Sequence, residues 1–263
     1  MSDTLKLVFF YIVIFLANIM QTITGFAGTV LAMPFSIILV GSDTARFVLN
    51  ILGIAASIGV VALNFKSIVW KEVIKICAIM LVGMVVGFII IQYANISRQI
   101  LYFILAGFVL LFTVIGCYNI FIKKQDNSMP ANDSKIKEAL LYVLLIVAGV
   151  VHGMFVCGGP LLIIYATKKL PEKNQFRSTL SMVWIVLNSV NLVRDIIAGT
   201  FKATGDMGQM FVILAISLIV LVGAVVVGNL VAKKLSKKAF IIITYVLMAI
   251  SAVSLILNAC GVF

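Results

Sequence analysis

The only histidine of the chain, His152, lies in a segment that is otherwise apolar, "GVVHGMFVCGGPLLIIY" at 149–165. Glycine and proline interrupt a helix, and the second half of an interrupted helix begins with free backbone N–H groups. Those groups and the helix dipole together favour anions. We therefore predict an anion site here. The residues that this segment would contribute are His152, Cys157, Gly158, Gly159 and Pro160.

A second stretch containing glycine and proline lies in the first half of the chain. "GFAGTVLAMPF" at 25–35 matches "GMFVCGGPLL" at 153–162. Gly25, Gly28 and Pro34 would form the partner break, and the two breaks would be the two halves of one site. Glycine and proline are also common in membrane helices that merely pack closely. Two breaks in matching places favour the site.

Polar side chains recur at helical spacing in the segment after each break. In the second half they are Arg177, Ser181, Trp184, Asn188, Asn191 and Asp195, and 131 residues earlier stand Arg46, Asn50, Gly53, Ser57, Val60 and Asn64. Steps of three and four place each series on one helix face. Polar residues inside a membrane span either line a pathway or join helices by hydrogen bonds. The substrate-binding residues that we expect from these faces are Asn50, Asn188 and Asn191 at the centre and Arg46 and Arg177 at two opposite mouths.

Two ionisable features of this region lead to further expectations. A buried histidine either packs or shuttles protons, so proton coupling at His152 stays open. Arg194 and Asp195 are adjacent in the chain. Their side chains leave a helix about 100° apart, so we expect no ion pair between them.

Long apolar segments must position these residues. The 263 residues are 63% hydrophobic and 11% charged, whereas about a quarter of a soluble domain is charged. Apolar runs separated by short charged loops predict a polytopic membrane protein. The expected segments are 5–23, 26–41, 47–63, 74–93, 100–122, 139–155, 158–167, 178–199, 209–231 and 239–259. The net charge of +11 is then a topology signal, and no nucleic-acid partner is expected.

Short sequence matches indicate an internal duplication. "LVGMVVG" at 81–87 resembles "LVGAVVVG" at 221–228, and "ISRQILYFIL" at 96–105 resembles "LSKKAFIIIT" at 235–244. The matches keep their order along the chain, so each half holds five segments. We predict one membrane repeat at 1–122, a polar linker at 123–138, and a second membrane repeat at 139–263.

The distribution of cations predicts how the repeats cross the membrane. Suppose that each broken unit returns the chain to its starting side, either as a re-entrant hairpin or as two short spans. The loops on one side then carry 15 of the 20 Lys and Arg residues, against a split of 10 to 10 if each unit crosses once. The positive-inside rule favours the first arrangement. The linker is then cytoplasmic, both termini lie outside, and the fold is all-α with two inverted repeats, each a broken unit followed by three transmembrane helices.

The two breaks, the polar faces and a "VW-x-E" loop (Val69, Trp70, Glu72) resemble the sulfite exporter TauE/SafE family over nearly the whole chain. The resemblance implies a multi-pass protein of the prokaryotic inner membrane. Its function would be secondary transport of small sulfur-containing or organic anions such as sulfite or sulfonates. The family name favours export, while the residues leave the direction open. The bilayer and the small anion are then the partners, while the coupling ion and a homo-oligomeric state stay open.

Two other functions compete with a carrier. A passive anion channel is the first, and the sequence does not separate it from a carrier. An intramembrane enzyme is disfavoured because the spans hold no HExxH, no GxSxG and no acidic pair. The four cysteines lie in or beside apolar runs without CxxC spacing. We therefore expect no catalytic residues, no metal and no cofactor.

Overall fold

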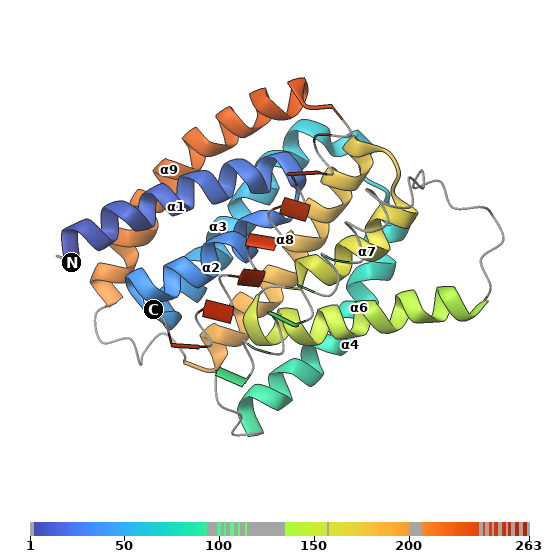
Figure 1. Cartoon of the computed structure of the whole chain (residues 1–263), viewed down its shortest axis with the longest axis horizontal. Helices are drawn as coiled ribbons and strands as arrows, with labels where there is room; N and C mark the ends of the chain where they lie inside the picture. The colour runs from blue at the N-terminus through green and yellow to red at the C-terminus, as the bar shows by residue number, and fades with distance from the viewer. Residues whose placement is uncertain are drawn as a thin grey trace.

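The computed structural model describes residues 3–93, 135–156, 158–199 and 207–236, with isolated positions between 99 and 114 and between 239 and 261. All regular elements in these ranges are helical (Figure 1). They are α1 (Asp3–Thr24), α2 (Ala27–Val40), α3 (Ser42–Asn64), the 3₁₀ turn η1 (Phe65–Ser67), α4 (Trp70–Tyr93), α6 (Lys135–Phe155), α7 (Gly159–Lys169), α8 (Lys173–Ile197) and α9 (Met207–Lys234).

Six described helices are long and apolar enough to cross a membrane. They lie at Asp3–Thr24, Thr44–Ser67, Trp70–Ile90, Glu138–Phe155, Lys173–Ile197 and Met207–Lys234. The prediction of an all-helical, multi-pass membrane protein is therefore confirmed. Helix α6 begins at Lys135, inside the stretch predicted as a linker at 123–138. The earlier part of that stretch, and most of the predicted segments 100–122 and 239–259, lie outside the described residues.

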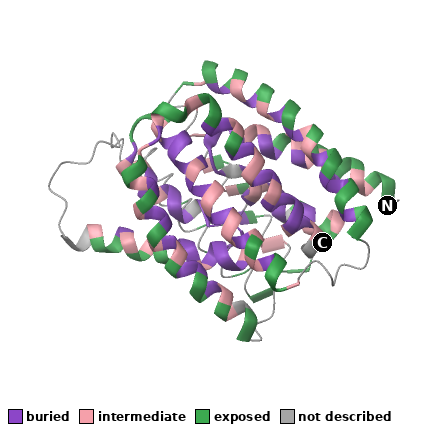
Figure 2. Ribbon diagram, turned by 180° about the vertical axis from the view of Figure 1, so that it is seen from behind, coloured by how far each residue is buried: buried purple, intermediate pink, exposed green. Residues whose placement is uncertain are grey.

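The distribution of side chains is that of a membrane protein, with an apolar outside and a partly polar inside. Helices α4 and α9 expose apolar residues such as Ile74, Val82, Ile219 and Val222. These residues suit the acyl chains of a bilayer. Asparagine, histidine, arginine and aspartate side chains are instead buried in α1, α3, α6 and α8. Figure 2 shows the buried residues gathered in the middle of the bundle.

Helices α3 and α8 run antiparallel through the centre. Arg46, near the start of α3, contacts Asp195 near the end of α8, and Asn64 at the end of α3 shares a cavity with Arg177 near the start of α8. Around this pair, α4 packs against α6 and α1 against α9, as Figure 1 shows. Helix α9 also packs against α3, and α4 against α8. Exchanging α1, α3 and α4 with α6, α8 and α9 leaves this list of contacts unchanged.

The contact between α4 and α6 brings their backbones together. A Cβ atom at Gly83 would lie 2.1 Å from the carbonyl oxygen of Ile146, and one at Gly149 would lie 2.1 Å from that of Met80. Small residues allow this approach, which is a common way to join helices in a membrane. Helix α6, which carries His152, is thereby held firmly against α4.

Candidate functional site

The chain reverses after α1 and after α6 through turns of the same local geometry. Gly25 follows α1 with φ of 85°, and its N–H donates to the carbonyl of Gln21 at 2.7 Å. Val156 follows α6 with φ of 59°, and its N–H donates to the carbonyl of His152 at 2.8 Å. Glycine adopts this conformation freely, but a β-branched residue does so at a cost of about 1–3 kcal/mol. Such strain concentrates at functional sites.

The residue one turn before each reversal binds the start of the next helix. Gln21 Oε1 accepts a hydrogen bond at 2.8 Å from the N–H of Gly28, in the first turn of α2. His152 Nδ1 accepts a longer one, at 3.5 Å, from the N–H of Gly158, which caps α7. Because Nδ1 accepts, the neutral imidazole carries its proton on Nε2. Gln21 and His152 are 131 residues apart, as are Gly25 and Val156.

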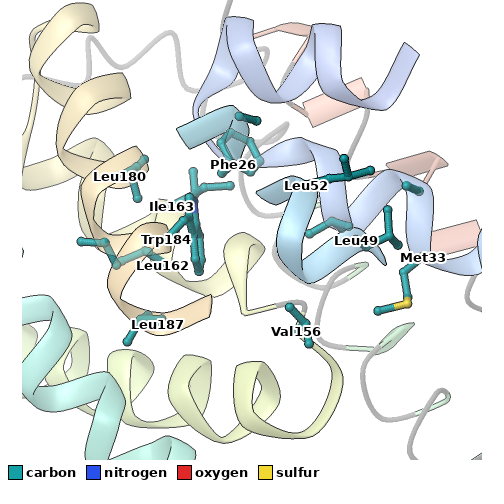
Figure 3. Packing of buried hydrophobic residues seen from close by; sticks show 14 of the residues in the cluster. Phe26, Met33, Leu49, Leu52, Val156, Leu162, Ile163, Leu180, Trp184 and Leu187 are labelled. Carbon is teal, nitrogen blue, oxygen red and sulfur yellow. The ribbon is translucent and has the colours of Figure 1, made fainter. Parts of the chain in front are cut away.

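A small enclosed cavity lies between the two reversals. Its lining residues are Gln21, Phe26, Thr29, Val30, His152, Val156, Gly159, Trp184 and Asn188. Figure 3 shows Phe26, Val156 and Trp184 around this space, each from a different segment of the chain. The cavity volume of about 10 Å³ is room for one water molecule. A bound oxyanion would therefore require the walls to move apart.

Three polar atoms of the cavity residues are buried without a hydrogen-bond partner among the described residues. They are Trp184 Nε1, His152 Nε2 and Asn188 Oδ1. The Asn188 amide lies within interaction range of the His152 ring, yet their geometry does not complete a hydrogen bond. The rings of His152 and Trp184 lie 5.1 Å apart. Most buried polar groups in folded proteins are paired, so this concentration indicates a place for water or a ligand.

A larger, positively charged vestibule opens at the start of α8. Its volume is about 560 Å³, and its lining residues are Leu63, Asn64, Glu172, Lys173, Asn174, Arg177, Asn229, Ala232 and Lys233. Lys173 Nζ donates to the carbonyls of Ala232 and Leu235, at 2.5 and 3.0 Å. Arg177 Nη2 donates to Asn229 Oδ1, while its buried Nε has no partner among the described residues. Three cations against one carboxylate make the vestibule attractive to anions.

At the opposite end of α8, about 27 Å away at helical rise, an ion-pair cluster joins three helices. Arg46 Nε lies 2.9 Å from Asp195 Oδ2, and Arg194 Nη1 lies 2.7 Å from Asp195 Oδ1. Arg46 also donates to the carbonyls of Met154 and Gly153, at 3.1 and 3.4 Å. The cluster ties α3 and α8 to the end of α6. An ion-pair cluster thus lies at this end of α8, whereas the vestibule lies at the other end.

The expectation that Arg194 and Asp195 do not pair is wrong. Their Cβ atoms do diverge, but an arginine side chain has enough rotatable length to curl back to the carboxylate beside it. The direction of the Cα–Cβ bond therefore does not decide where a guanidinium lies.

The structure brings some of the predicted site residues together and leaves others apart. His152, Gly159 and Asn188 line the enclosed cavity. Asn191 donates to the carbonyl of His152 at 3.3 Å, and Asn50 is buried with neither amide atom paired among the described residues. Arg46 and Arg177 lie at opposite ends of α8, in the ion-pair cluster and the vestibule.

The interruptions are shorter than the glycine and proline pattern predicts. Gly28 and Pro34 lie inside α2, and only Gly25 and Phe26 separate it from α1. Gly159 and Pro160 belong to the first turn of α7, where proline's missing N–H has no helical partner to lose. Cys157 lies outside the described residues. The sequence match of 25–35 with 153–162 is aligned on glycine residues. The backbone gives a different alignment, because the two residues of positive φ are Gly25 and Val156.

The predicted site residues do not include six that line the cavity: Gln21, Phe26, Thr29, Val30, Val156 and Trp184. Trp184 belongs to the predicted polar face, but only the asparagines and arginines of the two faces were predicted to bind the substrate. Gln21 stands 131 residues before His152, so extending the spacing of the polar faces backwards would have found it. The three apolar lining residues have no comparable signal.

Three findings bear on the class of protein to which this arrangement belongs. Among the described residues, no three His, Cys, Asp or Glu side chains are placed to hold a metal ion. No curated protein and no solved structure matches the chain. The sequence model of the family described as "Sulfite exporter TauE/SafE" matches residues 10–255, nearly the whole chain. With its apolar spanning helices, the chain belongs to the sulfite exporter TauE/SafE family of membrane transporters.

Proposed function

We propose that this protein is a secondary transporter that exports small sulfur-containing or organic oxyanions across a prokaryotic inner membrane. The central observation is the pair of buried, unpartnered ring nitrogens of Trp184 and His152 in the cavity where α2 and α7 begin. Both nitrogens carry a proton to donate when the imidazole is neutral. Two helix N-termini directed at one place add further positive potential.

The helices form two inverted repeats in this proposal. Three observations support it. Helices α3 and α8 run antiparallel, and both reversals pass through a residue of positive φ. When the halves are exchanged, the contacts α4–α6 and α3–α9 correspond to α1–α9 and α4–α8. Inverted repeats place the substrate site at their interface, often beside interrupted helices. The enclosed cavity has this location between α1–α2 and α6–α7.

The positive-inside rule orients the molecule. The vestibule carries Lys173, Arg177 and Lys233, so it faces the cytoplasm, and the Arg46 cluster faces outward. Labelling of an introduced cysteine tests this orientation, in a variant without the native cysteines. Ser236→Cys should react with an impermeant reagent only from the cytoplasmic side. Strong labelling in intact cells would reverse the orientation.

The geometry favours a carrier over a continuously open channel. An anion would enter the vestibule, reach the central cavity after its walls separate, and leave when Arg46 releases Asp195. The central cavity of only about 10 Å³ and the ion pair that joins α3 and α8 argue against a permanently open pore. Asp195, the only buried carboxylate among the described residues, is bound by two arginines. It is therefore poorly placed for acid–base catalysis, and we propose no enzymatic role.

The two tryptophans of the chain provide a matched test of the site. Trp184→Phe keeps the ring but removes the N–H donor, and should weaken substrate binding by about 1.5–3 kcal/mol, the range for a hydrogen bond to a charged group. Trp70→Phe makes the same change at a 44% exposed position and should have no effect. Uptake of sulfite, thiosulfate, sulfonates and carboxylates into proteoliposomes measures both. Wild-type affinity for every transported anion in Trp184→Phe would remove the cavity from the pathway.

A further inference from the structure

We infer that the enclosed cavity selects singly charged oxyanions and rejects dianions. This inference rests on the proposed function, because it names the substrate class of the same site. It concerns the cavity alone, since the vestibule has enough cations to attract either kind of anion.

The described residues that line the cavity include no lysine or arginine. The polar residues that line it are Gln21, Thr29, His152, Trp184 and Asn188. The donors without a partner are ring N–H groups, with Trp184 5% and His152 1% exposed. An anion in this cavity would therefore be in contact with neutral dipoles. The nearby cation, Arg46, lies behind the wall, on the carbonyls of Gly153 and Met154.

The positive potential of the cavity matches one negative charge. Helices α2 and α7 both begin at its edge and both exceed two turns in length. Each helix N-terminus acts as roughly half a positive charge, so the two together supply about one. The asparagine carbonyl of Asn188 is a further unpaired acceptor and opposes any additional negative charge.

Arg46 of α3 contacts the backbone of α6 near the cavity, but its guanidinium is already engaged. Arg46 donates to the carbonyls of Gly153 and Met154, directly after His152, and pairs with Asp195. Arg177 belongs to the vestibule at the other end of α8. Neither guanidinium is among the groups that line the cavity.

The free-energy cost of dehydration differs strongly between a monoanion and a dianion. The cost of moving an ion from water into a low-dielectric site grows as the square of its charge, so a dianion costs about four times as much as a monoanion of equal size. Attraction to neutral donors and helix dipoles grows only in proportion to the charge. The cavity therefore favours hydrogen sulfite and alkylsulfonates over the sulfite dianion and sulfate.

Three anions measure this selectivity in the purified full-length protein. Methanesulfonate is singly charged and sulfate doubly charged at all working pH values, while sulfite changes from one charge to two near neutral pH. Thermal stabilisation by methanesulfonate should be independent of pH and should need a concentration at least about tenfold lower than sulfate. The sulfite concentration required should rise about tenfold for each pH unit above its second ionisation.

Two variants locate the selectivity. Thr29→Lys places a cation in the cavity wall and should raise sulfate binding relative to methanesulfonate. Lys173→Gln removes a vestibule cation and should leave that ratio unchanged. If Thr29→Lys does not fold, Trp184→Phe replaces it and should weaken methanesulfonate and hydrogen sulfite by equal factors.

The outcomes separate this inference from the proposed function. Sulfate binding as tight as that of methanesulfonate, in a protein that transports either, would overturn the monoanion selectivity and leave the transporter intact. A shift of the sulfate-to-methanesulfonate ratio in Lys173→Gln would place the selectivity in the vestibule and would also overturn the inference. If no oxyanion binds or is transported, the proposed function fails and the inference fails with it.

Discussion

The units α1–α3 and α6–α8 have similar turns but differ in their chemistry. Each turns through a residue of positive φ, Gly25 in one and Val156 in the other. At the matching positions of α3 and α8 stand Gly53 and Trp184. A Cβ atom on Gly53 would lie only 2.8 Å from Asn188 Nδ2, so the first unit leaves space where the second places side chains. The second unit therefore supplies the unpartnered donors, while the first helps to enclose them.

The two ends of the central helix pair differ in a similar way. Arg46 and Arg177 occupy matching positions, but Arg46 meets Asp195 whereas Arg177 has Asn64 at the matching place in its vestibule. One end has an ion pair, and the other has an amide and a cavity of about 560 Å³. The two ends therefore differ by one carboxylate, because Asp195 at one end corresponds to Asn64 at the other.

Replacing Asp195 by asparagine should have the largest effect, because it makes the two ends alike. Arg46 and Arg194 would lose their shared carboxylate, at a cost of about 3–5 kcal/mol in stability for breaking a buried pair. We expect this end to open and to pass anions without counterflow. Flux in proteoliposomes and thermal unfolding measure the two effects. The reciprocal change, Asn64→Asp, should instead lower flux by pairing with Arg177. Unchanged stability and flux in Asp195→Asn would show that the ion pair is not what closes this end.

Exchanging the residues of positive φ tests whether the two turns are equivalent. Gly25→Val should destabilise the protein by about 1–3 kcal/mol or more, through backbone strain and a Cβ atom only 3.0 Å from the carbonyl oxygen of Arg177. Val156→Gly should be nearly neutral, since relief of similar strain offsets the loss of a buried side chain worth about 1.5–3 kcal/mol. Thermal unfolding in detergent measures both. A strongly destabilised Val156→Gly protein would mean that the valine is not strained.

The smallest effect is expected when His152 is replaced by glutamine, the residue type at the matching position of the first unit, Gln21. In His152→Gln the amide oxygen can accept from Gly158 and the NH₂ group can donate to the cavity, so substrate affinity should change by less than about 1 kcal/mol. His152→Leu provides neither group and should cost about 1–3 kcal/mol. Binding and flux across pH compare the two. If His152→Gln binds normally but loses proton-dependent flux, His152 is a proton carrier and the two units differ more than their geometry shows.

The sequence predicted the larger elements because hydrophobic length and charged loops are direct consequences of a bilayer. It also placed His152 and Asn188 correctly in a polar interior. It could not predict the turn at Val156, because no residue preference marks a valine for positive φ. The Arg46–Asp195 pair joins residues 149 positions apart, and only the antiparallel packing of α3 and α8 reveals it. Local patterns thus located the elements, and contacts between the halves determined the site.

The packing of α1 against α9 has a consequence for how the protein is made. Helix α1 is synthesised first and packs against α2, but its other large contact is with α9, which begins only at Met207, and Gly228 of α9 fits directly over Thr22. During translation α1 must remain in the bilayer, or with the insertion machinery, until nearly the whole chain has emerged. Its buried polar residues, Asn18, Gln21 and Thr22, are costly to leave facing lipid in that interval. Chains that end before α9 should therefore be degraded rather than persist as half-transporters.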